Sequence, residues 1–494
     1  MRGLSSKELA QLGREAKAPF KIGMATDEGV KNLVVTKILR LLPGKRLTAV
    51  AQYQGSTVVA KLFFHPQSWQ RHRDKERQGI KVIKKHKLLA PEIVAEYQLE
   101  QVGAVILLEY LEAANSLAEH FLIENQDDTN DPSKANLDKV LSSAFELLCL
   151  CHNCGLWQRD MHLGNYLLCE ERLYLIDGAD IQLHSEAANK TERLESIAEF
   201  ASQFPVYWDR KLETMLNSYG EHYRALSQDE LATIRCLVNQ IRRKRLAHIE
   251  KKVFKTTSAN RKIQRIDCLY VHDRRLSVSQ VEEFTQSPSS SFDKSPLLKN
   301  GDTTTVGQAV FANLSTVVKR YNVISFGKWL SHLPVPSRAQ KCWKNAHMLL
   351  LLGLRTPRPL MFYEERKFWL FRYRAYFLNE KLPASNLLDQ LNDENEFINK
   401  PELVTAFETF FQAMKDYQIS HGDMKATNFV FYNSSLYILD LDGMKRHKFK
   451  WVARRKGMND VRRFEKNWRD SPHEALFAPL IDKLYQERQV PRHD

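Results

Sequence analysis

Two stretches of the chain place acidic and amide side chains at matching intervals. In the first, QRDMHLGN followed by LYLID, Asn165 comes five residues after Asp160 (165−160) and Asp177 comes twelve after Asn165 (177−165). This order suits phosphoryl transfer. The first aspartate of a kinase-type site orients the attacking hydroxyl and accepts its proton, and the asparagine and second aspartate hold the magnesium that bridges the ATP phosphates. We predict that Asp160 is catalytic and that Asn165 and Asp177 bind the metal.

The second stretch, HGDMKATN followed by LYILD, repeats both intervals with Asp423, Asn428 and Asp440 (428−423 and 440−428). A single Asp-x4-Asn pair is expected about once by chance in a chain of this length, so one copy alone would be a weak signal. The repetition of the whole unit, each time behind a strand-like apolar run, indicates an internal duplication. We therefore predict that Asp423 is catalytic and that Asn428 and Asp440 bind metal.

A lysine precedes each of these stretches at a similar distance. Lys61 ends the strand-like run VVAK, where a kinase lysine would reach the α- and β-phosphates. Lys319 in VVKRYN takes the same part in the second copy. The interval from lysine to catalytic aspartate is 99 residues in the first copy (160−61) and 104 in the second (423−319). A lone strand-end lysine would be an ordinary exposed residue, but this context favours phosphate binding.

A lysine that holds phosphates needs a carboxylate to fix it, and a glutamate on the following helix can supply one. Glu76 lies fifteen residues after Lys61 (76−61) on the predicted helix SWQRHRDKERQGIKVIKKHKLL. We predict Glu76 as the partner and keep Asp74 as the alternative. The plain reading, a solvated carboxylate on a very basic helix, remains open.

The second copy departs from this pattern. No Asp or Glu occurs between Lys319 and Glu364, and aligning the prolines that end the two helices puts Cys342 where Glu76 stands. Either Lys319 has another partner, or the second unit is weakened as a catalyst.

Turns and a hinge complete the predicted nucleotide sites. Gly44 lies in a tight turn between two predicted strands, and Gly301 lies in a turn followed by threonines that could cover phosphates. Glu109 and Leu111 follow the apolar run GAVILLEYL. We expect their backbone to form the inter-lobe hinge that hydrogen-bonds an adenine.

Cationic residues flank the predicted catalytic aspartates. His162 and Lys425 each come two residues after them. A cation there can help neutralise the transferring phosphoryl group. Two residues before the aspartates, the second copy has His421 where the first has Gln158. This difference removes no predicted catalytic group.

Cysteine usage does not indicate a disulfide framework. Seven cysteines, an odd number, suggest reduced thiols. Cys149, Cys151, His152 and Cys154 invite a zinc reading, but the apolar residues around them recur at helical spacing, which favours a packed helix. The second copy lacks these residues, which excludes a metal site common to both.

Length and charge bound the possibilities. The 494 residues predict two to four domains, and a net charge of +14 with pI near 9.3 favours a polyanionic neighbour: nucleic acid, an anionic membrane face or a phosphorylated glycan. The N-terminus lacks the apolar region of a signal peptide, and the densest apolar run, 348–352, is too short to span a bilayer. We expect a cytoplasmic protein that is soluble or peripheral.

The second unit resembles the lipopolysaccharide core kinase family, which phosphorylates heptose or Kdo sugars of the inner core in Gram-negative bacteria. The resemblance rests on VVKRYN, CWKNAHMLLLLGLRTPRPL and HGDMKATNF…LYILDLDG. The first unit, with PGKRL, VVAKLFF, QRDMHLGN and LIDGAD, is similar to a more divergent member of the same protein-kinase-like clan.

The resemblance implies an α+β fold of two tandem bilobal kinase-like domains, each with a small β-rich N-lobe and a helical C-lobe. We expect a polar lead-in over 1–33, a first domain over 34–252, and a second over 253–494 with a mobile Ser/Pro insertion at about 285–296. The family implies ATP and Mg²⁺ as cofactors and action at the cytoplasmic membrane face. The implied acceptor is the lipopolysaccharide core or its lipid-linked precursor.

A basic segment near the end of the chain would suit such an anionic acceptor, although a plain solvated loop is an equal reading. It comprises Lys445, Arg446, Lys448, Lys450, Arg454, Arg455 and Lys456.

Two other functions stay open. One or both units could be pseudokinase scaffolds that bind nucleotide or lipopolysaccharide, a reading that the missing acidic partner of Lys319 favours. A kinase acting on a protein target is the other. We see no RNA-binding signature of aromatics among basic residues, so no nucleic-acid partner is expected. No feature indicates an oligomeric state.

Overall fold

The computed structural model describes residues 1–123, 133–289, 296–322, 336–367, 371–393 and 398–488. The chain forms two compact units. Unit 1 comprises Met1–Gln203 and Lys211–Leu237, and unit 2 comprises Phe204–Arg210 and Val238–Asp494. Half of the predicted Ser/Pro insertion, residues 290–295, lies outside the described residues.

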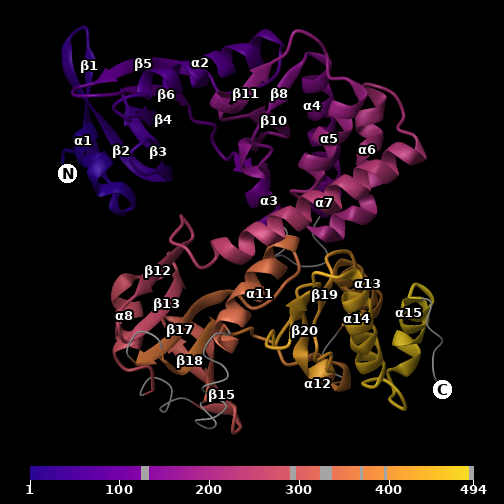
Figure 1. The fold of residues 1–494 in the computed structure, drawn as a ribbon. Coiled ribbons are helices and arrows are strands. Elements are labelled where there is room, and N and C mark those ends of the chain that lie inside the picture. Colours follow the sequence, from indigo (N-terminus) through magenta and orange to yellow (C-terminus); the bar gives the residue numbers. More distant parts are fainter. Residues whose placement is uncertain (124–132, 290–295, 323–335, 368–370, 394–397, 489–494) are drawn as a thin grey trace. The chain divides into compact units, whose positions relative to one another are not determined.

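Unit 1 begins with a closed six-stranded barrel (Figure 1). Its strands follow the order β1 (Phe20–Thr26), β2 (Gly29–Leu42), β3 (Arg46–Tyr53), β4 (Ser56–Phe63), β6 (Ala104–Glu109) and β5 (Ile93–Leu99). Along β3, Leu47, Ala49 and Ala51 are fully buried and alternate with more exposed residues. This period of two is the pattern of a strand with one face on a core.

The predicted polar lead-in over 1–33 differs from the structure. These residues form helix α1 (Ser6–Leu12), strand β1 and the start of β2. Leu9, Phe20 and Met24 are buried in the same core as β3. In FKIGMAT the apolar Phe20, Ile22 and Met24 alternate with small or polar residues, which is the pattern of a half-buried strand, and the prediction of a polar lead-in overlooked it.

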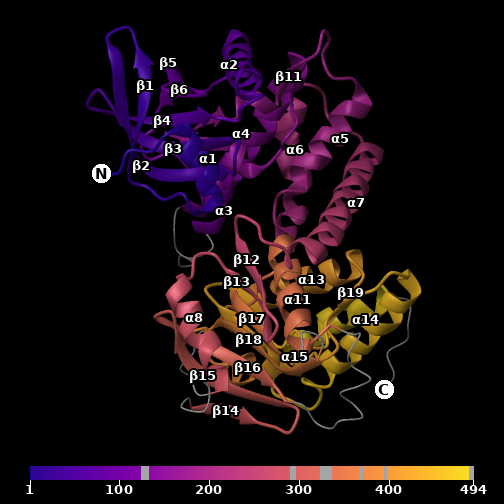
Figure 2. The same cartoon turned by 60° about the vertical axis from the view of Figure 1, so that its left-hand side comes forward.

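The rest of unit 1 is largely helical. Helix α2 (Trp69–Lys85) connects β4 to β5, and the helices α3 (Leu117–Ile123), α4 (Ser133–Asn153), α5 (Lys190–Ala201) and α6 (Leu212–Glu221) follow the barrel. Between α4 and α5 lie the short strands β8 (Leu156–Gln158), β9 (Tyr166–Cys169), β10 (Arg172–Leu175) and β11 (Ile181–Leu183). Figure 2 shows α4, α5 and α6 grouped together beyond the barrel.

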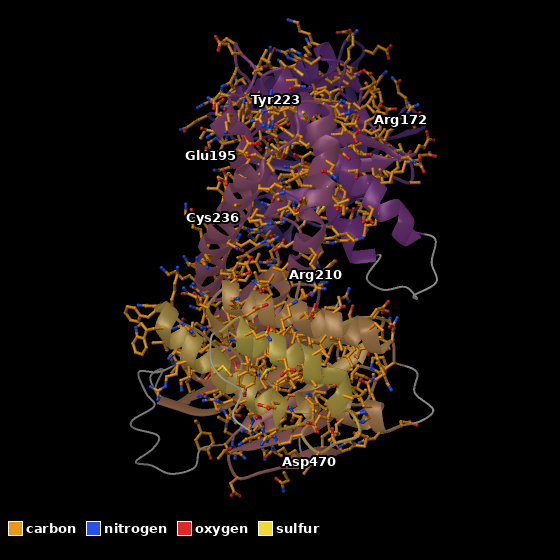
Figure 3. The ribbon with its side chains drawn as sticks, turned by 90° about the vertical axis from the view of Figure 1, so that its right-hand side faces the viewer. Arg172, Glu195, Arg210, Tyr223, Cys236 and Asp470 are labelled. Atoms are coloured by element: carbon orange, nitrogen blue, oxygen red, sulfur yellow. The ribbon has the colours of Figure 1, made fainter. Side chains whose placement is uncertain are left out.

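The cysteine cluster lies on α4, as its helical spacing predicted. Cys149 and Cys151 are buried, and both ring nitrogens of His152 are hydrogen-bonded, to Tyr219 and Ser196. All seven cysteines lie among the described residues and none forms a disulfide, and Cys236 on α7 (Gln228–Lys252) is the exposed one (Figure 3).

The boundary between the units also differs from the predicted 252/253. It falls within α7, after Leu237. Arg242, ten residues before the predicted boundary, is buried within unit 2. Its guanidinium lies 2.6 Å from Asp209 and donates to the Tyr417 hydroxyl at 3.1 Å. A buried arginine must be paired, and the partners of Arg242 belong to unit 2. Residues of α7 before the predicted boundary at 252/253 are therefore part of unit 2.

Unit 2 contains a seven-stranded antiparallel sheet. Its order is β12 (Asn260–Gln264), β13 (Cys268–Asp273), β17 (Pro359–Lys367), β18 (Phe371–Glu380), β16 (Leu314–Tyr321), β15 (Thr304–Phe311) and β14 (Leu297–Asn300). Helix α11 (Arg338–Leu352) packs on β17 and β18 (Figure 1).

Helix α8 (Val278–Gln286) packs on the sheet in a cluster of its own. An aromatic core lies among the helices α12 (Leu387–Asn392), α13 (Lys400–Asp416), α14 (Lys450–Glu465) and α15 (Glu474–Gln486). Phe407, Phe464 and Phe477 from three of these helices pack with ring centroids 4.8 to 5.8 Å apart, the geometry of favourable aromatic pairs. The short strands β20 (Phe429–Tyr432) and β21 (Ser435–Ile438) lie beside this core and lead to the second predicted site.

Candidate active sites

In unit 1, the three residues of the first motif lie on one loop system. Asp160 follows β8, Asn165 precedes β9, and Asp177 follows β10. The Asn165 side chain donates to the Asp160 carbonyl at 2.9 Å, and the Asn165 carbonyl accepts from the Ile176 N–H at 3.0 Å. The constant spacing in the sequence thus corresponds to a closed hydrogen-bonded unit.

The second motif has the same hydrogen bonds in unit 2. The Asn428 side chain donates to the Asp423 carbonyl at 2.9 Å, and its own carbonyl accepts from the Leu439 N–H at 2.8 Å. Asp177 and Asp440 both have positive φ, 67° and 41°. Non-glycine residues adopt this conformation uncommonly, aspartate more readily than most, and such residues occur at active sites as well as in turns.

Gln158 and His421 make equivalent contacts, although one is an amide and the other an imidazole. The Gln158 amide donates to the Ile176 carbonyl at 3.3 Å, and the His421 Nε2 lies 3.2 Å from the Leu439 carbonyl. Each carbonyl belongs to the residue just before a predicted metal-binding aspartate. Burial lowers the pKa of His421. Gln158 and His421 therefore make the same contact with the backbone just before Asp177 and Asp440, although their side chains differ.

Lys61 is paired with Glu76 and not with Asp74. The Lys61 Nζ lies 2.5 Å from the Glu76 carboxylate and 3.5 Å from Asp177. Glu76 is fully buried on α2 and also accepts from the backbone N–H groups of Gly178 and Ala179, at 3.1 and 3.2 Å. Asp74 instead pairs with arginines on its own helix. Glu76 thus ties the lysine to the segment that carries Asp177.

Positive side chains surround the Asp177 carboxylate. Besides Lys61, the guanidinium groups of Arg40 and Arg46 lie 3.4 and 3.6 Å from its oxygens. Burial alone would raise the pKa of Asp177, but Lys61, Arg46 and Arg40 overcome this effect and lower it. The carboxylate therefore stays ionised at neutral pH, as a metal ligand must.

In unit 2, Lys319 has a different partner. Its Nζ donates to Asp440 at 2.9 Å. Cys342, which the alignment placed at the position of Glu76, does not pair with Lys319. This buried thiol on α11 lies 2.7 Å from Asp442 and 3.3 Å from the Tyr321 hydroxyl. Burial raises the pKa of the Cys342 thiol well above its usual value, so it is neutral and cannot act as the counterion of Lys319.

Two residues of α14 support the second site and were not predicted. The Asp460 carboxylate accepts from the His421 and Gly422 N–H groups at 2.7 and 2.8 Å, and the Arg463 guanidinium lies 2.8 Å from Asp423. Asp460 and Arg463 are three residues apart, so they share one helix face. The sequence separation from Asp423 is about 40 residues, so no local spacing marked them.

Asp460→Asn should destabilise unit 2 by about 1–3 kcal/mol, because an amide cannot accept from both backbone donors and leaves one buried N–H unsatisfied. Denaturant unfolding and hydrogen exchange at His421 and Gly422 measure the effect. The matched control is Asn459→Ala, at an exposed neighbouring position on the same helix. Equal stability and equal amide protection in the two variants would contradict this role of Asp460.

Three further predicted residues lie in turns and at a strand end. Gly44 occupies the β2–β3 turn with φ of +67°, and the Gly301 N–H donates to the Thr304 carbonyl at 3.2 Å in the β14–β15 turn. Glu109 ends β6, and its N–H donates to the Glu92 carbonyl at 2.9 Å.

The other three are Leu111, predicted as a hinge residue, and His162 and Lys425, which follow the predicted catalytic aspartates. The Leu111 carbonyl accepts from the Ala114 N–H at 3.4 Å. His162 is exposed and accepts from the Gly164 N–H at 3.0 Å, and the Lys425 Nζ lies 3.8 Å from Asp423.

No group of three or more His, Cys, Asp or Glu side chains in the described part of the chain could hold a metal ion. Magnesium is bound differently from zinc, usually by one or two protein oxygen ligands together with substrate phosphates and water. The donor sets Asn165 with Asp177 and Asn428 with Asp440 fit this requirement. Among the described residues, no helix is both long and apolar enough to cross a bilayer.

Comparison with known proteins gives a partial match. Residues 322–478, about a third of the chain, match the model of the Lipopolysaccharide kinase (Kdo/WaaP) family. Among curated proteins, none matches the sequence.

Two similar solved structures are WaaP in complex with acyl carrier protein and the PknI kinase domain of Mycobacterium tuberculosis. The WaaP structure has 18% identity and a TM-score of 0.32, covering 42% of this chain and 86% of that one. The PknI structure has 14% identity and a TM-score of 0.27, covering 42% and 95%. The family match includes Asp423, Asn428 and Asp440, so the chain contains a Lipopolysaccharide kinase (Kdo/WaaP) family region and is an ATP-dependent kinase.

Proposed function

We propose that this kinase transfers the γ-phosphoryl group of ATP, with Mg²⁺, to a heptose or Kdo hydroxyl of the lipopolysaccharide inner core. One observation carries the proposal: the family match over 322–478 contains a complete Asp423, Asn428 and Asp440 set held in one hydrogen-bonded loop system. The expected location is the cytoplasmic face of the membrane in which the lipid-linked acceptor is made.

In this proposal Asp423 positions the acceptor hydroxyl and takes its proton. Arg463 and Lys425, 2.8 and 3.8 Å from its carboxylate, place positive charge where the transferring group is negative. Asn428 and Asp440 would hold the magnesium, which supplies neutralisation of the phosphate charges when bound. Lys319 would clamp the phosphates.

We further propose that unit 1 is also a kinase-like domain, so that units 1 and 2 are two such domains in tandem. The same hydrogen bonds join Asn165 to Asp160 and Ile176 as join Asn428 to Asp423 and Leu439. Asp160 is the proposed base, Asn165 and Asp177 the proposed metal ligands, and Lys61 with Glu76 the phosphate clamp.

A pseudokinase scaffold is the second candidate function for unit 2. The observation that favours it is Cys342, a neutral thiol where unit 1 has the carboxylate of Glu76. In such a scaffold the Lys319–Asp440 pair would stabilise the fold without turnover.

The deciding experiment is transfer of label from γ-labelled ATP with Mg²⁺ into isolated lipopolysaccharide core acceptors by the intact chain. Acceptors with the heptose or Kdo hydroxyls already phosphorylated serve as controls. Label in the unmodified acceptor alone supports the kinase proposal. Nucleotide binding in a thermal-shift assay, with no label in any core acceptor, would support the scaffold instead.

A surface of unit 2 fits contact with an anionic membrane. Phe449 and Trp451, at the start of α14, have 62% and 68% of their surface exposed. The basic segment around them includes the exposed residues Lys448, Lys450, Arg455 and Lys456. Exposed aromatic side chains beside lysines and arginines suit the interface of an anionic bilayer, where the rings insert and the cations meet headgroups.

The Phe449→Ala, Trp451→Ala double variant should bind phosphatidylglycerol-containing vesicles roughly tenfold to hundredfold more weakly, because two aromatic rings no longer leave water. Vesicle co-sedimentation measures this. The control pair is Ile266→Ala with Val310→Ala, also exposed apolar residues of unit 2. Equal binding by both double variants would argue against insertion of the rings, and a loss confined to soluble core oligosaccharide would assign this surface to the sugar.

A further inference from the structure

Arg40 of unit 1 lies in line with the phosphate-clamp lysine across three strands. In the barrel, Arg40 on β2 is opposite Thr48 on β3, and Thr48 is opposite Lys61 on β4. Directly opposed residues of neighbouring strands project to the same face. Arg46 stands two residues before Thr48, so it shares that face as well.

This alignment follows directly from the tight β2–β3 turn. Leu42 is opposite Arg46, Leu41 is opposite Leu47 and Arg40 is opposite Thr48, with no break in the register. Residues directly opposed across this hairpin share a face, so Arg40 and Thr48 lie on the face away from the buried Leu47. On that face the Arg40 guanidinium lies 3.4 Å from Asp177.

The Asp177 carboxylate gathers the cations of this cluster. Arg40, Arg46 and Lys61 lie beside it, and the carboxylates of Glu76, Asp180 and Asp160 interact electrostatically with the same group of charges. All three groups lie within 3.6 Å of Asp177, and Lys61 is already fixed by Glu76 at 2.5 Å. An ATP molecule bound with Mg²⁺ still carries about two negative charges, and arginine forks match phosphate oxygens in geometry as well as charge.

We propose that Arg40 and Arg46 bind the nucleotide phosphates in unit 1, as side-chain donors on the two strands that flank the Gly44 turn. This inference rests on the proposed nucleotide site of unit 1. The two guanidinium groups lie on Asp177 in the nucleotide-free chain and form charge-assisted hydrogen bonds with the phosphates in the complex.

The matching row of unit 2 carries one cation fewer. Lys299 on β14 is opposite Val306 on β15, and Val306 is opposite Lys319 on β16. Lys299 therefore corresponds to Arg40. The position that corresponds to Arg46 is Thr304, opposite Tyr321 as Arg46 is opposite Phe63. Unit 1 should accordingly prefer nucleotides with more phosphate charge than unit 2 does.

The test measures nucleotide binding to the intact chain by calorimetry, with unit 2 disabled by Lys319→Met and Asp440→Asn. In this background, Arg40→Ala with Arg46→Ala should weaken ATP binding about a hundredfold, because each charge-assisted hydrogen bond contributes roughly a factor of ten. Binding of adenosine, which has no phosphates, should change less than about twofold. The Arg40→Lys, Arg46→Lys variant should recover part of the ATP affinity.

The control pair is Arg172→Ala with Arg235→Ala, which removes the same charge from exposed positions of unit 1 (Figure 3 labels Arg172). Unchanged ATP affinity in the Arg40, Arg46 variant would overturn the inference while leaving the nucleotide site of unit 1 intact. An equal loss of ATP affinity in the control pair would also overturn the inference, because it would show that the positive charge of unit 1 attracts ATP from a distance without direct contact. If the background chain binds no ATP at all, the nucleotide site of unit 1 fails, and the inference with it.

Discussion

Asp423→Asn in the intact chain should lower phosphate transfer into the lipopolysaccharide core by about a hundredfold to ten-thousandfold, the usual contribution of a positioned general base. An asparagine keeps the size of Asp423 and its hydrogen bond with Asn428, which is 3.1 Å long, but cannot accept the proton of the acceptor hydroxyl. Because the fold is undisturbed, ATP binding should persist. The measurement is the initial rate of label transfer at saturating ATP.

Three further variants show which unit performs this reaction. Asp440→Asn should be about as damaging as Asp423→Asn, since it removes a proposed metal ligand and the partner of Lys319. Asp160→Asn should leave transfer to the core within a few-fold of the unmodified rate, because the family match covers unit 2. Asp470→Asn is the matched control: Asp470 is exposed and has φ of 62°, which asparagine also tolerates (Figure 3).

The reverse pattern would assign the reaction to unit 1. If Asp160→Asn stops transfer and Asp423→Asn does not, unit 2 is a scaffold, in agreement with the neutral Cys342 thiol at the position of Glu76. Loss in both single variants would mean that each unit performs a required step.

The parts of the sites that sequence spacing predicted are those built by short segments. The Asp160–Asn165–Asp177 loop closes over eighteen residues, so a fixed interval in the sequence corresponds to a fixed hydrogen-bonded shape. The Lys61–Glu76 pair was also predictable, because a strand and the next helix along the chain carry it.

Other contacts depend on packing that no interval encodes. Arg40 and Asp177 are 137 residues apart, so their contact depends on how the barrel packs against the loop that carries Asp177. Asp460 and Arg463 reach their site because α14 docks against the loop from far along the chain. The replacement of Glu76 by Cys342 was visible by alignment, but the choice of Asp440 as the new partner of Lys319 required the structure.

Helix α2 approaches the Asp177 segment so closely that only glycine fits at the contact. A Cβ on Gly79 would lie 1.9 Å from the Gly178 carbonyl oxygen and 2.7 Å from the Gly178 Cα. A Cβ on Gly178 would meet the Glu76 carbonyl at 2.6 Å. Both neighbours are backbone atoms, which cannot rotate away as a flexible side chain can.

Gly79→Ala should therefore push α2 away from Gly178, at a cost of about 1–3 kcal/mol for unit 1. The displacement separates Glu76 from the Gly178 and Ala179 N–H groups and from Lys61, so nucleotide affinity of unit 1 should fall together with stability. Denaturant unfolding measures the stability. Hydrogen exchange at Gly178 and Ala179 measures the displacement directly, since both amides lose their carboxylate acceptor.

Gly220→Ala is the matched control, because Gly220 is also a helical glycine of unit 1, on α6. There the added Cβ would approach Ala225 no closer than 3.4 Å, an ordinary contact, and alanine is favoured over glycine in helices by about 1 kcal/mol. The two substitutions thus add the same methyl group, but we expect Gly79→Ala to lower the free energy of unfolding and Gly220→Ala to raise it. If Gly79→Ala instead matches Gly220→Ala in stability and in protection of Gly178, then α2 is free to move relative to Asp177. Glu76 would in that case position Lys61 only after nucleotide has bound.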